Sequence, residues 1–388
     1  MTPGARVAAA IEVLEDMTEG LAAEQALTRW ARRSRFAGSK DRAAIRDHVF
    51  DVMRQRRSAA HFGQSDDPRA LMIGLLHLQG ADLDVLFNGE GHAPAALSEA
   101  ENAFPEPPTD KATRWNLPDW ILPEFERSLG DAAEATAQAL QSRAPVFLRA
   151  NLLKMERATV QKSLQGEGIE TVENPLAETS LTVLEGARKI RNSNAFLQGN
   201  VELQDAASQA VVAALPKGGK VLDYCAGGGG KALALAMDKT RRIFAHDIDP
   251  RRMGDLPVRA DRADAKITQI STEQISTHAP YEVVLCDVPC SGSGAWRRAA
   301  EGRWSLTPEQ VQNLNQTQDQ ILDKAAQLVA AGGVLAYATC SVFACENEDR
   351  ISAFLSRHPR WSCSFSKRFG VTSEGDGFFT AHLTHASY

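Results

Sequence analysis

The chain after residue 220 repeats one pattern, in which a short apolar or β-branched run is followed by a loop and then by a helical stretch. The runs with strand character are 220–224, 242–246, 265–270, 281–286 and 333–338. Strands that alternate with helices pack in parallel, because each helix carries the chain back to the edge where the previous strand began. We therefore predict an α/β fold with a mostly parallel, doubly wound sheet. Two later runs, 361–365 and 378–384, are predicted to complete the sheet as an antiparallel edge.

The first part of the chain has helical periodicity instead. Ile45, Val49 and Met53 recur at four-residue spacing among charged residues, which indicates a single apolar stripe on one helix. We predict an all-helical domain over residues 1–85. The acidic segment 86–115 is rich in proline, which sustains neither a helix nor a central strand, so we predict a linker there.

A third kind of pattern lies between the linker and the sheet. A strand is predicted near 146–151, a helix near 158–164, and short extended stretches near 170–172 and 181–183. Strands and a helix on this scale are typical of a small α+β module, which we place at 116–200. The catalytic domain is then 201–388, and its helix at 307 begins with a capping box formed by Thr307 and Gln310.

The net charge of -6 is unevenly distributed. Residues 81–110 hold seven acids and no Lys or Arg, so the rest of the chain is about +1, since -6 plus 7 is +1. Basic residues gather in the first domain at Arg29, Arg32, Arg33, Arg35, Lys40 and Arg42. Such a cluster indicates either a solvated helical face or contact with nucleic-acid phosphates, and the charge alone does not separate the two.

Six cysteines, with no CxxC pair, favour reduced thiols over a disulfide framework and indicate no metal site. The N-terminus lacks a signal-peptide pattern, and no uninterrupted apolar run is long enough to span a bilayer. We therefore expect a cytoplasmic protein that needs no membrane. No feature indicates an obligate protein partner, and we expect a monomer.

A glycine-rich loop follows the first strand of the sheet and runs directly into a helix. It comprises Cys225, Ala226, Gly227, Gly228, Gly229, Gly230 and Lys231. Glycines let a ligand approach the backbone and leave the amides at the helix start free to bind it. The spacing fits neither a Walker loop nor a GxGxxG dinucleotide fingerprint. The alternative is a turn that only reverses the chain.

Two acids follow the second strand. Asp247 lies 16 positions after Lys231, where a carboxylate can accept the ribose hydroxyls of an adenosine-containing cofactor. Asp249 precedes Pro250, which indicates a helix cap. We predict the cofactor role for Asp247 and the capping role for Asp249.

Two cysteines lie just past strands at the carboxyl edge of the sheet, where doubly wound folds bind ligands. Cys290 follows the fourth strand together with Asp287, and Cys340 follows the fifth. We expect both thiols to face one cleft, where one could attack an electrophilic carbon and the other could help to break the bond. Cys286 and Cys363 are instead interpreted as inert core residues.

At these motifs the sequence resembles the Fmu/Sun (RsmB-like) RNA cytosine carbon-5 methyltransferases, which use S-adenosylmethionine. The matching segments are 148–151, 196–199, 204–208, 225–231, 287–294, 337–341, 346–348 and 376–381. The helical N-terminus is similar to the NusB-like domain of the ribosomal members, and the middle module would bind RNA. The resemblance implies a Rossmann-like methyltransferase sheet and an RNA substrate, 16S ribosomal RNA above others.

The resemblance also implies roles for individual residues. Cys340 would attack carbon 6 of a flipped cytosine, Cys290 would assist release, and Asp287 would hydrogen-bond the base edge. The loop 225–231, Asp247 and Asp287 would bind S-adenosylmethionine. Where the family commonly has an acid after the third strand, this chain has Ser271 and Thr272.

Four other functions compete with this one. A tRNA cytosine methyltransferase and a non-enzymatic ribosome-assembly factor would use the same fold on RNA. A DNA cytosine methyltransferase would use Cys290 as the nucleophile and would not need Cys340. A nicotinamide oxidoreductase fits the glycine spacing poorly.

Overall fold

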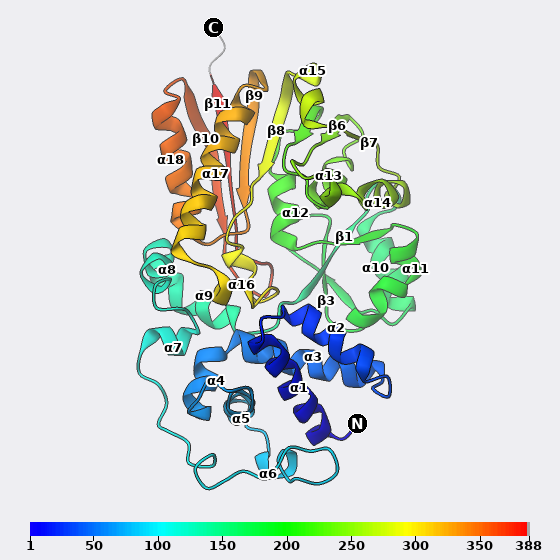
Figure 1. The fold of residues 1–388 in the computed structure, drawn as a ribbon. Coiled ribbons are helices and arrows are strands. Elements are labelled where there is room, and N and C mark those ends of the chain that lie inside the picture. Colours follow the sequence, from blue (N-terminus) through cyan, green and yellow to red (C-terminus); the bar gives the residue numbers. More distant parts are fainter. Residues whose placement is uncertain (386–388) are drawn as a thin grey trace. The chain divides into compact units, whose positions relative to one another are not determined.

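The computed structural model describes residues 1–385, and the chain forms two compact units (Figure 1). The helical unit comprises Met1–Glu126, Gly130–Arg143 and Trp296–Ser305. The sheet unit comprises Arg127–Leu129, Ala144–Ala295 and Leu306–Tyr388. This division differs from the predicted ranges in two places. Most of 116–143 packs with the helices, and so does Trp296–Ser305, which the sequence had assigned to the catalytic domain.

The helical unit is built on α1, α3 and α5, which pack against one another. Its helices are α1 (Pro3–Thr18), α2 (Ala23–Arg33), α3 (Ser39–Arg54), α4 (Arg56–Gly63), α5 (Pro68–Leu78), α6 (Leu83–Leu86), α7 (Lys111–Trp115), α9 (Ala133–Leu140) and α16 (Gly302–Ser305), and α8 (Leu122–Leu129) begins in it. The stripe Ile45, Val49 and Met53 on α3 is buried, as its spacing predicted. The segment between α6 and α7 is mostly turns and irregular chain.

The segment Trp296–Ser305 is anchored in the helical unit by polar contacts as well as by packing. The guanidinium of Arg303, fully buried, donates to the carbonyls of Asn116 at 3.1 Å and Leu140 at 3.0 Å. The indole of Trp304 donates to the carbonyl of Met53 at 2.7 Å. Burial lowers the pKa of Arg303 to about 9.

The sheet unit begins with a small antiparallel sheet in the order β2-β3-β1-β4. Its strands are β1 (Val146–Ala150), β2 (Thr171–Glu173), β3 (Ser180–Val183) and β4 (Val201–Leu203), with α10 (Arg157–Gly166) and α11 (Asn194–Leu197) beside them. The sequence indicated the first three strands but not β4, because a strand of three residues is too short to show an alternating apolar pattern. Since β4 pairs with β1, the small sheet extends to Leu203.

The larger sheet has the order β10-β11-β9-β8-β5-β6-β7 within residues 1–385. Its strands are β5 (Gly219–Asp223), β6 (Arg241–Ala245), β7 (Ile267–Gln269), β8 (Tyr281–Asp287), β9 (Val329–Thr339), β10 (Trp361–Phe369) and β11 (Phe378–His385). The strands from β5 to β9 are parallel, and β11 and β10 close one side antiparallel. The predicted doubly wound α/β fold is therefore confirmed.

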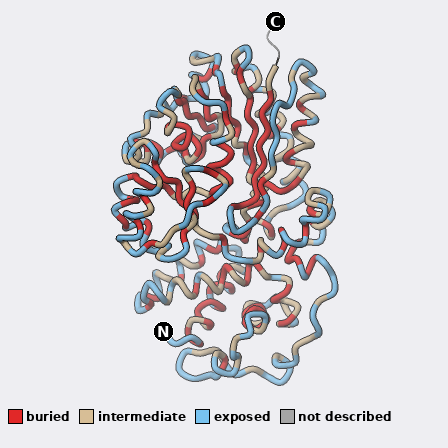
Figure 2. Tube along the Cα trace, turned by 180° about the vertical axis from the view of Figure 1, so that it is seen from behind, coloured by how far each residue is buried: buried red, intermediate tan, exposed pale blue. Residues whose placement is uncertain are grey.

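Helices cover both faces of this sheet, which is why its central strands are buried (Figure 2). One face packs against α12 (Ala206–Ala213), α13 (Gly230–Leu235) and α14 (Leu256–Ala263). The other face packs against α15 (Ile275–His278), α17 (Pro308–Ala326) and α18 (Glu348–Arg357). The predicted capping box starts α17, where Thr307 and Gln310 exchange two hydrogen bonds. Among residues 1–385, none of the helices combines the length and apolarity needed to cross a bilayer.

Candidate active site

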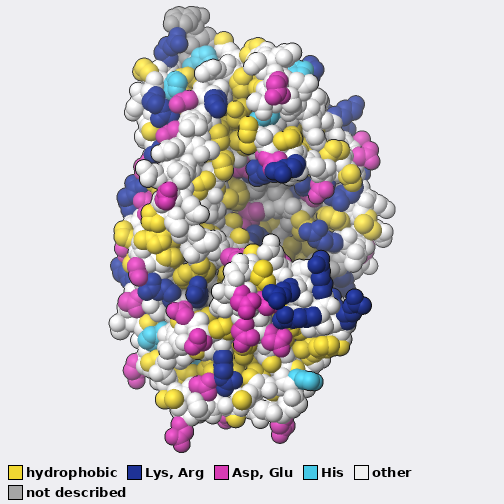
Figure 3. All heavy atoms as spheres, viewed as in Figure 1, with side chains coloured by type: hydrophobic (Ala, Val, Ile, Leu, Met, Phe, Trp, Pro, Cys, Tyr) yellow, Lys and Arg dark blue, Asp and Glu magenta, His cyan; other side chains and the backbone are white. Residues whose placement is uncertain are grey.

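A cavity of about 730 Å³ opens at the carboxyl ends of β5, β6, β8 and β9, a size that suits a small-molecule cofactor together with a base. The space-filling view shows the surface hollowed beside α17 (Figure 3). Most of the lining residues come from the glycine loop, the Asp247 loop, the Asp287–Cys290 loop, the Cys340 loop and α17. They include Cys225, Gly228, Lys231, Asp247, Asp287, Cys290, Cys340, Gln320 and Lys324.

The glycine loop adopts backbone conformations that only glycine accepts readily. Gly227 and Gly229 have φ values of +53° and +77°. The φ of Gly229 disfavours any side chain there, and a Cβ would also displace the Leu256 side chain, whose Cδ1 would lie 2.4 Å away. Gly228 is exposed on the cavity side, and Gly230 begins α13. Burial raises the pKa of the Cys225 thiol, which keeps this cysteine uncharged.

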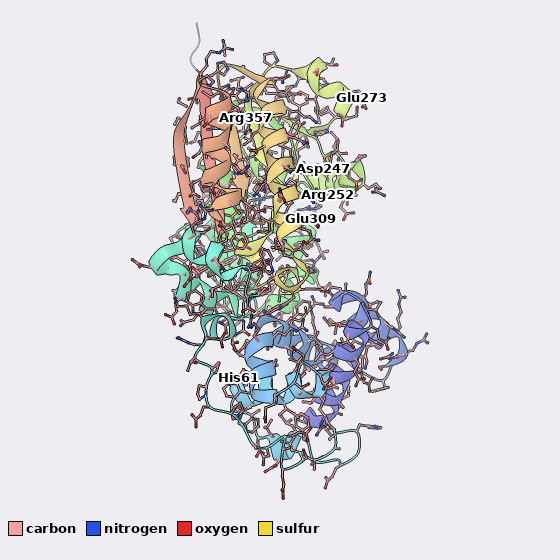
Figure 4. All side chains as sticks on the ribbon, turned by 60° about the vertical axis from the view of Figure 1, so that its left-hand side comes forward. His61, Asp247, Arg252, Glu273, Glu309 and Arg357 are labelled. Atoms are coloured by element: carbon pink, nitrogen blue, oxygen red, sulfur yellow. The ribbon has the colours of Figure 1, made fainter. Side chains whose placement is uncertain are left out.

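Asp247 is fixed in place by the glycine loop itself. Its buried carboxylate accepts from the amide of Gly227 at 2.8 Å and from the amide of Asp249 at 3.0 Å, and it pairs with Arg252 at 3.2 Å. Figure 4 shows Asp247 and Arg252 side by side. Asp249 caps the short helical turn Pro250–Met253 by accepting from the amide of Arg251, so its predicted role is confirmed.

Three ionisable side chains lie near one another at the cavity: Lys231 and Asp287 line it, and the buried Asp223 is affected by the charges of both. The ammonium of Lys231 lies 2.7 Å from the Asp287 carboxylate. Burial lowers the pKa of Lys231, but the charge and hydrogen bond of Asp287 outweigh that effect and raise it. Asp223, at the end of β5, is wholly buried, and neither carboxylate oxygen has a hydrogen-bond partner in the described part of the chain. Burial first, and then the charge of Asp287, raises the pKa of Asp223 to about 7.

The two predicted cysteines do meet. The Sγ atoms of Cys290 and Cys340 are 3.5 Å apart, and both line the cavity. The hydrogen bond with Cys340 and burial raise the pKa of the Cys290 thiol well above its usual range. At neutral pH Cys290 is therefore held as a protonated thiol that can donate to the neighbouring sulfur.

The prediction that Cys286 and Cys363 are core residues holds for only one of them. Cys286 is buried within β8, as predicted, and burial raises the pKa of its thiol. Cys363 was predicted to be a core residue, and that is wrong. It lies exposed on the edge strand β10, where residues on both faces of the strand are exposed from Ser362 to Lys367.

The matching motifs included Ser341 and Glu346, but the sequence assigned no role to the polar groups that hold the cysteine loops. Glu346 and Ser341 are buried, and Gln318 reaches the same point from α17. No sequence signal marked Gln318, since an amide on a helix is usually exposed. On the side of the cavity near Asp247, His246 bridges the Tyr224 carbonyl at 2.7 Å and the Thr272 hydroxyl at 3.0 Å. Thr272, which follows β7, therefore supplies a hydroxyl at this side of the cavity.

The basic cluster of the helical unit contains both paired and unpaired side chains. Arg29 and Arg33 pair with Asp16, and Arg42 donates to the carbonyl of Ala37. Arg32, Arg35 and Lys40 are exposed, and within residues 1–385 no ion pair or hydrogen bond of their side chains is found. Phe36 is 75% exposed between them. We call these four residues, which run from the end of α2 to the start of α3, the α2 basic surface. Lys and Arg side chains gather in this region in Figure 3.

Comparisons with known proteins agree with this geometry. A sequence model of the 16S rRNA methyltransferase RsmB/F family matches residues 210–384, and one of the RsmF/B-like ferredoxin-like domain matches 117–191. Ribosomal RNA small subunit methyltransferase B of Xylella fastidiosa is 30% identical over 89% of this chain and 90% of its own length. The chain belongs to the RsmB/F family.

Other relatives cover the chain to different extents. A probable ribosomal RNA small subunit methyltransferase B of Bacillus subtilis is 31% identical over 66% of this chain, which spans 60% of that relative. The match to the crystal structure of PH0851 has a TM-score of 0.77 at 22% identity. It covers 99% of this chain and 99% of that one, which supports the fold. The RsmB/F chain is thus an RNA methyltransferase. The bare glycine loop and the carboxylate of Asp247 line the cavity and fit S-adenosylmethionine, the methyl donor that the resemblance implies.

Proposed function

We propose that this RsmB/F protein methylates carbon 5 of a cytosine in 16S ribosomal RNA through a covalent bond between Cys340 and carbon 6. The observation that carries the proposal is the 3.5 Å separation of the Cys290 and Cys340 sulfurs at a cavity that also reaches the glycine loop. A protein that only scaffolded RNA would have no use for two adjoining thiols at this edge.

In the proposed reaction, each residue at the cavity has a separate role. The Cys340 thiolate adds to carbon 6, and the electron pair of the 5,6 double bond makes carbon 5 nucleophilic. The glycine loop and Asp247 would hold S-adenosylmethionine, which would supply an electrophilic methyl group to carbon 5. A base then removes the carbon 5 proton, the C6–S bond breaks, and Cys340 leaves as a thiolate. The protonated Cys290 thiol donates a hydrogen bond to that departing sulfur.

Asp287 is assigned to the base edge. Its carboxylate is oriented by Lys231 at 2.7 Å and is about one third exposed toward the cavity. A carboxylate in that position can accept from the exocyclic amine of cytosine. The Lys231 ammonium places a positive charge beside the ring while negative charge develops on it.

RNA affinity is assigned to the α2 basic surface. Arg32, Arg35 and Lys40 have no acidic partner among the described residues, so their charges are available for phosphates. The exposed ring of Phe36 offers a stacking face for an unpaired base. The net acidity of the chain does not oppose this, because its acids gather elsewhere in the sequence.

Bisulfite sequencing of RNA from cells with and without the gene tests the function directly. The expected result is one 5-methylcytosine in 16S ribosomal RNA that is lost on deletion and restored by the wild-type gene. Loss of a methylcytosine from tRNA instead would assign the alternative substrate. An unchanged pattern of 5-methylcytosine in RNA would overturn the proposed carbon 5 methylation.

A further inference from the structure

The carboxylate of Glu346 lies behind the two cysteines and is completely buried. Its Oε1 accepts from the amide of Ser291 at 2.8 Å and from the side-chain amide of Gln318 at 3.2 Å. Its Oε2 accepts from the hydroxyls of Ser291 and Ser341. Four donors therefore converge on one carboxylate, which is the condition under which a buried acid is tolerated.

Three of the four donors belong to the residues that follow the cysteines. Ser291 comes directly after Cys290, and Ser341 directly after Cys340. Gln318 also donates to the carbonyl of Pro289 at 2.9 Å, so the Cys290 loop is held on both sides of its sulfur. One carboxylate thus ties the loop after β8 to the loop after β9.

Glu346 is itself fixed by the strand that carries Cys340. The hydroxyl of Tyr337 donates to the Glu346 carbonyl at 2.6 Å. The side chain of Asn347 accepts from the Thr339 hydroxyl at 2.6 Å and donates to the Ser341 carbonyl at 2.9 Å. The carboxylate therefore has little freedom to follow a moving loop.

We propose that Glu346 is a positioning residue, which holds the loops of Cys290 and Cys340 together so that both thiols face the same cytosine ring. Hydrogen bonds to a carboxylate are shorter and stronger than those between neutral groups, so one acid can fix two loops. The proposal rests on the proposed function for its catalytic meaning. The separation of the thiols, however, can be measured without RNA or methyl transfer.

The first measurement is oxidation by diamide, a diazene. Diamide takes two electrons and two protons from a pair of thiols, becomes the hydrazide, and leaves an S–S bond. The rate at which the Cys290–Cys340 peptide pair forms is followed by mass spectrometry in the wild type and in Glu346→Gln. The glutamine has nearly the same shape, but its NH2 group faces donors. We expect pair formation to slow at least about fivefold, because the loops separate.

Glu348→Gln is the matched control. Glu348 pairs with Arg368 and with none of the donors at Glu346, so this variant should oxidise at the wild-type rate. Equal rates in Glu346→Gln and the wild type, at equal melting temperature, would overturn the proposal. So would a wild type that forms no Cys290–Cys340 bond. If Glu346→Gln does not fold, Ser341→Ala replaces it, since it removes one donor and leaves the charge, and the same slowing is expected.

Turnover gives the second measurement. If Glu346 positions the thiols, Glu346→Gln should lower kcat at least about tenfold while KM for RNA stays within about twofold, because small displacements of reacting groups are costly. A rise in KM alone would assign Glu346 to RNA binding and overturn the proposal. If the wild type methylates no RNA but the oxidation difference persists, the proposed function fails and the positioning role stands.

Discussion

The sulfur atoms of Cys290 and Cys340 lie 3.5 Å apart although 50 residues separate them in the chain. Two parallel neighbours, β8 and β9, end side by side, and each delivers its cysteine to the same edge. The contact itself does not distinguish the attacking thiol from the assisting one. Only a variant that interrupts the reaction at a known stage can do so.

Alanine variants of the two cysteines should interrupt the reaction at different stages. Cys340→Ala should abolish methyl transfer and leave no adduct, because the attacking sulfur is missing. Cys290→Ala should attack and methylate once but stall before release, giving a protein–RNA adduct that survives denaturing electrophoresis. Cys286→Ala, buried within β8, is the control for the loss of a thiol. An adduct trapped by the Cys340 variant alone would reverse the assignment.

The Asp247 carboxylate should contribute to cofactor affinity. Asp247→Ala removes the acceptor that holds the Gly227 amide and the acid proposed to meet the ribose hydroxyls. We expect the Kd for S-adenosylmethionine in calorimetric titration to rise at least about tenfold, the equivalent of about 1.4 kcal/mol. Asp249→Ala, which loses only a cap and an exposed ion pair with Arg251, should bind nearly as the wild type does. Equal Kd values for the wild type and Asp247→Ala would remove Asp247 from the site.

The sheet and its ligand edge could be predicted because their signals are local. Val221 and Leu222, for example, belong to an apolar run that is followed by glycines, and this local pattern can be recognised without knowledge of the tertiary structure. Cys290 and Cys340 were assigned to one cleft by the same argument, since parallel strands end at one edge. The order of the strands then brought the thiols together.

What the sequence did not indicate depends on distant partners. Gln318 is a polar residue on a long helix, and only the packing of α17 against β8 turns its amide toward Pro289. An arginine side chain is usually exposed to solvent, yet the buried guanidinium of Arg303 donates hydrogen bonds to the carbonyls of Asn116 and Leu140 in the helical unit. Cys363 was misplaced because its run is apolar enough for a core strand, whereas the strand lies at the edge of the sheet.

The α2 basic surface should give RNA binding its salt dependence. Each phosphate contact with single-stranded RNA contributes a slope of roughly 0.7 in log affinity against log salt. Replacing Arg32, Arg35 and Lys40 by alanine should therefore reduce the slope by about 2. A double variant of Lys111 and Arg114, which are already paired with Glu126 and Glu134, should leave it unchanged. Fluorescence anisotropy at several salt concentrations would measure both, and equal slopes would assign the surface to another role.

Phe36 should contribute affinity that salt does not screen. Stacking of one base on an aromatic ring is worth about 1–3 kcal/mol, so Phe36→Ala should weaken RNA binding about tenfold at every salt concentration. Phe36→Trp keeps a stacking face and should bind as tightly as the wild type. If the tryptophan variant binds as weakly as the alanine variant, the ring acts on folding or packing, and melting temperatures would separate those cases.

Asp223 should make the protein less stable as the pH rises. Its pKa is about 7 in the folded chain, against an ordinary value of about 4 in the unfolded one, so between these values the folded state binds the extra proton. The free energy of unfolding therefore decreases as the pH rises through this window, by up to about 4 kcal/mol for a shift of about 3 units.

Asp223→Asn removes the ionisable group while keeping the shape. The variant should melt at a higher temperature than the wild type at pH 8 and at nearly the same temperature at pH 4. Glu282→Gln, an exposed change on β8, controls for general charge effects. If instead Asp223→Asn melts below the wild type at pH 8, the Asp223 carboxylate stabilises Lys231 more than its own burial costs.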